Sequence, residues 1–158
     1  QRPSPVGFPF LGHLGIIAMS IVVENAERKC EEAEIVYGHE ECYKTSIELL
    51  EEMGFPRGVM PLKNIDECGF VKKTGFLWMK QKEPYEHFFE ATGMRVLYDS
   101  EVTGYMENLK MTKMTGIRSK QLFLSVPIIE MTIEDDSERI IFKVPLGIGK
   151  SFPISAFH

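Results

Sequence analysis

The densest group of chemically capable side chains is formed by Tyr98, Asp99, Ser100, Glu101 and Tyr105. A serine becomes a nucleophile when a nearby base removes its proton. No histidine adjoins this group, so His87, on a neighbouring predicted strand, would have to act as the base. Ser100 and His87 would then make an ester hydrolase. An Asx-type bend at Asp99 and Ser100 explains the same residues without catalysis and is the preferred interpretation.

A second candidate is the run Gly-Ile-Gly-Lys-Ser at residues 147–151, which ends like a phosphate-binding loop. Such a loop needs a glycine where this chain has Val144, and a following helix whose N–H groups point at the phosphate. Pro153 opposes that helix, and Phe152 stands where a dinucleotide fingerprint has its third glycine. The sequence also lacks the Gly-x-Ser-x-Gly elbow of α/β-hydrolases. We therefore expect no nucleotide and no other cofactor.

Two short segments contain metal-binding residue types without metal-binding geometry. Residues 39–42 read His-Glu-Glu-Cys, but adjacent positions of a helix point in different directions and do not converge on one ion. The acidic residues of segment 134–138 lack the spacing of an EF-hand loop and are typical of a solvated hairpin turn. We expect no metal site.

The many methionine and aromatic residues suggest a different function, the binding of an apolar ligand. The chain has nine methionines and eleven phenylalanines, and flexible thioethers adapt to irregular apolar shapes. This composition suits a lipid or pigment pocket, although ordinary core packing is the preferred explanation for most of it. The candidate ligand-binding residues are Trp78, Phe88, Tyr105 and Phe123.

A basic stretch beside some of these methionines could meet anionic lipid headgroups. A solvated basic hairpin is the preferred explanation for it. The residues concerned are Lys110, Lys113, Arg118 and Lys120.

Two helices are predicted before residue 54. Residues 20–37 are rich in Glu, Ala and Lys, and Gly38 is placed to cap a helix C-terminus. Residues 40–53 repeat apolar side chains at helical spacing, with glutamates on the other face. Gly54 and Pro56 end this second helix.

After Pro61 the pattern alternates with a period of two, which predicts strands. A turn at residues 72–75 precedes a strand in which Phe76 and Trp78 face one side, and Leu77 and Met79 face the other. Further strands are expected at 85–90, 95–107, 109–115, 121–133, 140–144 and 152–157. Pro127 requires an edge position or a bulge in the long 121–133 strand. The predicted fold is mainly β, a partly open antiparallel β-barrel of about eight strands with two N-terminal α-helices.

The composition indicates a single globular domain. A chain of 158 residues with 44% hydrophobic residues can bury a core, and its net charge of -5 argues against nucleic-acid binding. The excess of acidic residues lies in residues 24–52, which contain ten glutamates and only three basic residues. The three cysteines cannot all pair, which favours free thiols and an intracellular location, cytoplasmic or peripheral to membranes, with secretion left open. The sequence sets no oligomeric state.

The N-terminal stretch is apolar but interrupted. Residues 8–23 resemble a signal-peptide core, yet Pro, Gly and His break the run, and it is too short to span a bilayer. We interpret residues 1–18 as a leader or non-native extension and residues 19–158 as one domain. An uncleaved amphipathic anchor is the alternative.

Four segments together resemble a plant family known as domain of unknown function 538, and especially its SVB-like (smaller with variable branches) members. They are residues 49–62 (Leu-Leu-x-x-Met-Gly-Phe-Pro-x-Gly-Val-Met-Pro-Leu), TGFLWM at 74–79, YDSEVTGY at 98–105, and the Pro- and Gly-rich strands of 122–157. The resemblance covers about residues 26–157. It implies a partly open β-barrel and links to trichome growth and stress responses. It also implies a proposed similarity to the lipid-binding domains of bactericidal/permeability-increasing proteins, and a suggested pigment hydrolysis. It carries over no catalytic residues.

Three functions follow, in order of preference. The first is a non-enzymatic protein that binds an apolar or amphipathic ligand, or a membrane surface, in the mouth of the barrel. The second is a protein–protein adaptor that uses its acidic helices. The third is a weak ester or pigment hydrolase with Ser100 and His87.

Overall fold

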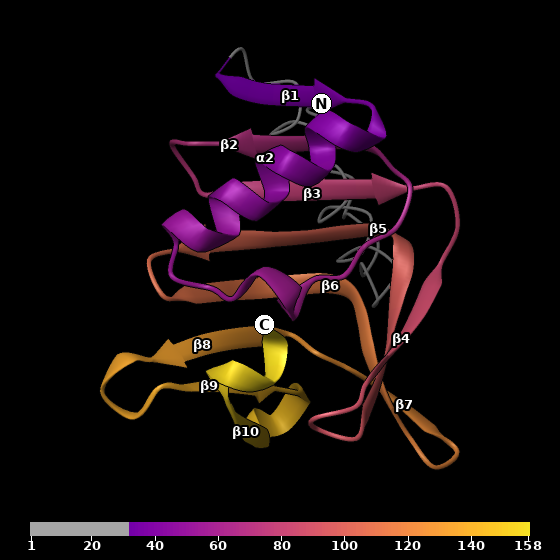
Figure 1. Ribbon diagram of the computed structural model, residues 1–158, viewed down its shortest axis with the longest axis vertical. Helices are drawn as coiled ribbons and strands as arrows, with labels where there is room; N and C mark the ends of the chain where they lie inside the picture. The colour runs from indigo at the N-terminus through magenta and orange to yellow at the C-terminus, as the bar shows by residue number, and fades with distance from the viewer. Residues whose placement is uncertain (1–31) are drawn as a thin grey trace, which may run out of the picture.

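A computed structural model describes residues 32–158, which form a mainly β structure: one antiparallel sheet with an α-helix lying across it (Figure 1). Most of the helix predicted for residues 20–37 lies outside the described residues, and so does the predicted 1–18 leader. The strands predicted after Pro61 are present as a series of strands, and the predicted mainly β class is confirmed.

The first described element corrects the predicted helix. Ala33–Tyr37 is a strand, β1, which pairs antiparallel with β2 (Ile65–Val71). The β-branched Ile35 and Val36 favour an extended strand when a partner strand is available. Gly38, with a φ of 89°, precedes the next helix and does not end an earlier one.

The helix α2 (His39–Glu52) confirms the second predicted helix. Glu40 and Glu41 lie in its first turn, where negative charge interacts favourably with the helix dipole. Its buried face packs on the sheet and consists of Cys42, Ser46, Ile47 and Leu50.

The sheet of residues 32–158 contains ten strands in the order β1-β2-β3-β5-β6-β8-β9-β10, with β4 paired to β5 and β7 paired to β6. Short 3-10 turns at Arg57–Val59, Asp135–Ser137, Pro145–Gly147 and Ile154–Phe157 complete the described structure. The strands not yet given are β3 (Phe76–Gln81), β4 (Tyr85–Phe89), β5 (Met94–Glu107), β6 (Lys110–Gln121), β7 (Leu124–Pro127), β8 (Glu130–Glu134), β9 (Arg139–Lys143) and β10 (Gly149–Pro153).

The long hairpin of β5 and β6 is bent in its middle. Between two cross-strand pairs, β5 runs from Tyr98 to Thr103 while β6 covers only Ile117 to Thr115, so β5 bulges there. Before the bulge β5 pairs with β4, and after it β5 pairs with β3. Likewise the last part of β6 pairs with β7 and its first part with β8. The sheet therefore branches at this bend.

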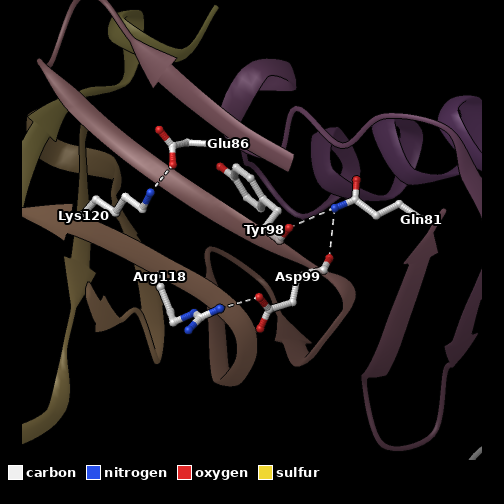
Figure 2. Close-up of polar contacts among 6 residues, drawn as sticks. All are labelled: Gln81, Glu86, Tyr98, Asp99, Arg118 and Lys120. Atoms are coloured by element: carbon white, nitrogen blue, oxygen red, sulfur yellow. Dashed lines mark hydrogen bonds and ion pairs between the residues drawn. The ribbon is translucent and has the colours of Figure 1, made fainter. Parts of the chain in front are cut away.

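Polar contacts hold the bend (Figure 2). The buried Gln81 side chain of β3 donates through Nε2 to the backbone oxygens of Tyr98, at 3.1 Å, and Asp99, at 2.9 Å. Arg118 of β6 donates to the Asp99 carboxylate at 2.7 Å. Buried amides are stable only when their donors are satisfied, so Gln81 fixes the β5 bulge against β3.

The sheet is not closed into a barrel. Within the described residues β1 and β10 are its two ends, and they do not pair with each other. The sequence predicted one strand over 121–133, but this segment forms β7 and β8, which pair with separate parts of β6. Pro127 ends β7 at an edge, as predicted, because proline cannot donate to a further strand. Splitting this strand branches the sheet instead of extending it round a barrel.

The faces of β3 alternate as predicted. Leu77 and Met79 belong to the main core under α2, whereas Phe76 and Trp78 form a second cluster with Val71. The final predicted strand is also corrected, because β10 ends at Pro153 and a 3-10 turn then carries Phe157 into the main core.

Glycine at position 116 should be essential to the bend. Gly116 has a φ of 79°, and a Cβ there would lie 2.1 Å from the backbone oxygen of Glu101. Gly93, with a φ of 67°, is the matched control because a Cβ there meets nothing within 4 Å. Gly93→Ala should lower the free energy of unfolding by about 1–2 kcal/mol through backbone strain alone. Gly116→Ala should lower the free energy of unfolding by about 1–3 kcal/mol more than Gly93→Ala does, because the backbone at Glu101 must move to admit the new Cβ. Equal urea midpoints for the two variants would contradict this account of the bend.

Candidate ligand-binding cleft

A cleft of about 610 Å³ lies between α2 and the strands β1, β2 and β3. Figure 1 shows α2 crossing this part of the sheet at an angle to the strands. The β2–β3 turn and the end of β5 close one side of the cleft. The helix contacts mainly β2 and β1, and its Leu49 and Met53 side chains border the cleft.

The cleft has an apolar floor and a charged rim. Leu49 and Met53 of α2 face Phe70 of β2 and Leu77 of β3 across it. Lys72 and Lys73 of the exposed β2–β3 turn lie on the rim, as do glutamates of α2, β1 and β5. Such a combination of an apolar interior with a few charged groups at its entrance is typical of small-molecule sites.

One buried polar group in the cleft has only a weak partner. Ser46 of α2 is only 7% exposed, and among the described residues its Oγ makes no well-formed hydrogen bond, only a weak interaction with the neighbouring Cys68 thiol. A buried hydroxyl without a partner costs free energy comparable to a lost hydrogen bond. A ligand or a water in the cleft would supply the missing contact.

Two buried thiols lie beside this serine on the same helix and on β2. Cys42 donates to the backbone oxygen of Val36 at 3.2 Å, and Cys68 lies 3.9 Å from the backbone oxygen of Cys42. Burial, and then the neighbouring Cys42, raise the pKa of the Cys68 thiol to about 12. Ser46 only partly offsets this rise of the Cys68 pKa. A thiol with so high a pKa is protonated at neutral pH and is a poor nucleophile.

The four predicted ligand-binding residues do not come together. Trp78 is 1% exposed and borders the cleft, but its ring belongs to the second cluster and stacks over Gly69, where a Cβ would lie 2.1 Å from the ring. Tyr105 lies near it, with its ring 5.2 Å from that of Phe76. The other two lie elsewhere: Phe88 is 47% exposed on β4, and Phe123 is fully exposed at the β6–β7 turn.

The interior of the sheet offers no alternative pocket. The space enclosed by its core residues is about 10 Å³, too small for more than one water. Methionine side chains fill it together with the rings of Phe89, Phe142 and Phe157, whose centroids lie 5.2–5.4 Å apart in contact pairs. The methionine-rich core is thus packed, and a ligand in the mouth of a barrel finds no support in the geometry.

The polar cluster around Asp99 is engaged in structural contacts. Asp99 pairs with Arg118, and Tyr98 donates its buried hydroxyl to the backbone oxygen of Val59 at 3.3 Å. Burial raises the pKa of Tyr98 well above its usual range. These contacts of Tyr98 and Asp99 hold the bend, whereas Ser100 and Glu101 border a separate open hollow of about 380 Å³.

Ser100 and His87 are not brought together. His87 of β4 lies opposite Val96 of β5, four residues before Ser100, which corresponds to roughly 13 Å along the strand. The Nδ1 atom of His87 is 3.1 Å from the hydroxyl of Tyr85, and burial and then Lys63 lower the pKa of His87. No described contact links this histidine to the exposed Ser100.

The described residues contain no group of three His, Cys, Asp or Glu side chains arranged to hold a metal ion. Among the same residues, no helix combines the length and the apolar character needed to cross a bilayer.

The structure therefore defines a class of protein: a branched antiparallel sheet with a helix-covered cleft, and no assembled catalytic group among its described residues. Residues 46–158 match the family described as "Protein of unknown function, DUF538". The chain belongs to this family. No curated protein and no solved structure matches it.

Sequence reasoning missed the cleft itself. The apolar face of residues 40–53 and the turn at 72–75 were both predicted, but neither indicates that a cleft lies between the helix and the turn. The sequence contains only a weak indication that Ser46 belongs to a site, because it is a single small polar residue on the apolar face of a predicted helix.

Thiol chemistry tests the burial of the two cysteines. We expect a Cys30→Ser protein to show no rapid reaction with Ellman's reagent at pH 8. Cys42 is fully buried, and at a pKa of about 12 only about one Cys68 thiol in ten thousand is ionised. Both thiols should react once guanidinium unfolds the chain. Adding Ser100→Cys, at an exposed position, provides a control that should react at once. Rapid reaction of a native thiol in the Cys30→Ser protein would refute the buried placement.

Proposed function

We propose that this protein is a non-enzymatic binder of an amphipathic small molecule, held in the cleft between α2 and the sheet. The observation that carries the proposal is the cleft itself. Its volume of about 610 Å³ falls within the 300–1,000 Å³ typical of ligand sites. The packed interior of the sheet leaves the cleft as the larger of the two apolar hollows described.

The chemistry of the lining indicates how such a ligand would lie. Its apolar part would contact Leu49, Met53 and Phe70, replacing water on side chains that are otherwise only partly buried. Its polar end would reach the lysines of the β2–β3 turn on the rim. The Ser46 hydroxyl would hydrogen-bond to the ligand inside the cleft, where a polar group gains most from a partner.

The other functions have less geometric support. A hydrolase would need a nucleophile and a base in contact, and Ser100 and His87 lie on separate parts of β5 and β4. An adaptor role for α2 rests on its exposed glutamates, of which Glu51 is paired with Arg57 at 3.0 Å. The plant origin, the SVB-like subgroup and the roles in growth and stress remain predictions from the family resemblance.

Filling the cleft should abolish binding. Leu49→Trp places a larger side chain in the cleft, whereas Tyr43→Trp enlarges the same helix at a position that is 50% exposed. We expect the wild-type chain to bind dansylundecanoic acid or Nile red with one site per chain, followed by dye fluorescence. Leu49→Trp should weaken that binding at least about tenfold, a loss of about 1.4 kcal/mol, while Tyr43→Trp leaves it unchanged.

The melting temperature of each variant provides the folding control. A folded Leu49→Trp protein that binds both dyes as tightly as wild type would contradict the proposal. Failure of the wild-type chain to bind either dye would contradict it as well.

A further inference from the structure

Exposed apolar side chains are concentrated on two loop tips outside the cleft. At the β6–β7 turn Leu122 and Phe123 are fully exposed and Leu124 is 70% exposed. In the β9–β10 loop Leu146 is 96% exposed and Ile148 is 64% exposed. Figure 1 shows the β6–β7 hairpin projecting from the body of the molecule. Neither tip belongs to the cleft or to the described core.

Both tips also contain a leucine in a disfavoured backbone conformation. Leu122 has a φ of 54° and Leu146 a φ of 71°, in the left-handed region that glycine and asparagine adopt more readily. Leu109 also has a positive φ, of 59°, but its side chain is used in packing: it lies against the core over Gly54. The two-residue β6–β7 turn requires a positive φ at Leu122. Neither Leu122 nor Leu146 gains packing in return, so folding does not explain why large apolar residues occupy these positions.

A polar hollow lies between the strand ends that lead to the two tips. This hollow of about 380 Å³ is bordered by the β4–β5 turn, the end of β6 and the start of β10. Its described lining contains Lys120 and Lys150, with hydroxyls of Ser119 and Ser151, and no carboxylate. The hollow is therefore positively charged in a chain whose net charge is -5.

The two lysines differ in their contacts. Lys120 pairs with Glu86, which also binds Arg95 at 3.1 Å, so this trio keeps one positive charge (Figure 2 shows Glu86 and Lys120). The first cause of the lowered Glu86 pKa is the Lys120 contact, followed by Arg95. Exposed Lys150 makes no ion pair within residues 32–158 and remains available to an anion.

We propose that this end of the molecule docks on an anionic bilayer surface. Leu122, Phe123 and Leu146 would enter the boundary between headgroups and acyl chains, which accepts apolar side chains from separate, convex tips. Lys120 and Lys150, at the bases of the tips, would lie at the level of the lipid phosphates. A protein partner would have to supply two matched pockets around a cationic hollow, whereas a fluid bilayer adapts to both tips. This surface is separate from the cleft and does not depend on a ligand there.

Vesicle binding tests the proposal. The full chain should sediment with phosphatidylcholine vesicles that contain phosphatidylserine at least about tenfold more strongly than with pure phosphatidylcholine vesicles. A variant with Leu122→Asn, Phe123→Ser and Leu146→Asn should lose this binding. Its urea midpoint should be equal to or higher than that of wild type, because asparagine accepts the left-handed conformation more readily than leucine.

Two controls separate the apolar and electrostatic contributions. Tyr37→Ser removes an exposed aromatic side chain from β1, and it should leave vesicle binding unchanged. Lys150→Gln should weaken binding to the phosphatidylserine vesicles about fivefold and leave the weak binding to pure phosphatidylcholine unchanged.

Two results would overturn the proposal. The first is that the three-site tip variant keeps its phosphatidylserine-dependent binding, which would place the contact elsewhere in the full chain. The second is that the wild-type chain binds neither kind of vesicle. Leu49→Trp should bind vesicles like wild type, so failure of the cleft and failure of the docking surface are distinguishable.

Discussion

The bend of the β5–β6 hairpin is the constraint on which the rest of the structure depends. At this point β5 leaves β4 and joins β3, and β6 leaves β8 and joins β7. The Gln81 amide, the Asp99–Arg118 ion pair and the close approach at Gly116 hold the bulged backbone in place. Without this bend the hairpin would continue as a flat ladder. The sheet would then have no branch to separate the strands under α2 from the hairpin that carries the exposed tip.

The bend thus creates two surfaces with different chemistry. On one side, β1, β2 and β3 form the floor of a cleft covered by α2, where the weakly partnered Ser46 hydroxyl and apolar side chains border the hollow. On the other side, the ends of β6 and β10 present apolar tips around a hollow with two lysines. Between them the methionine-rich core is fully packed. Both proposed binding sites therefore lie on surfaces of the sheet, and the core holds these surfaces in position.

Local patterns in the sequence predicted much of this fold. The helical spacing of residues 40–53, the alternation of Phe76 to Met79 and the edge position of Pro127 all follow from side-chain periodicity and backbone chemistry. β1 was missed because glutamate- and alanine-rich sequence favours a helix until a partner strand overrides that preference. The branching was missed because it depends on which strands pair at long range. The candidate site was missed for a related reason: a cleft depends on how far a helix stands from a sheet, which single-residue patterns do not encode.

The Ser46→Ala substitution tests the ligand-binding cleft most directly. If the Ser46 hydroxyl is kept for a ligand, removing it relieves a buried, weakly partnered group and stabilises the free protein by about 1 kcal/mol, or about 3 °C in melting temperature. The same substitution should weaken binding of whichever dye occupies the cleft, because the bound molecule loses its buried hydrogen bond. A lower melting temperature with unchanged dye affinity would show that the hydroxyl serves the fold alone, and would contradict the account.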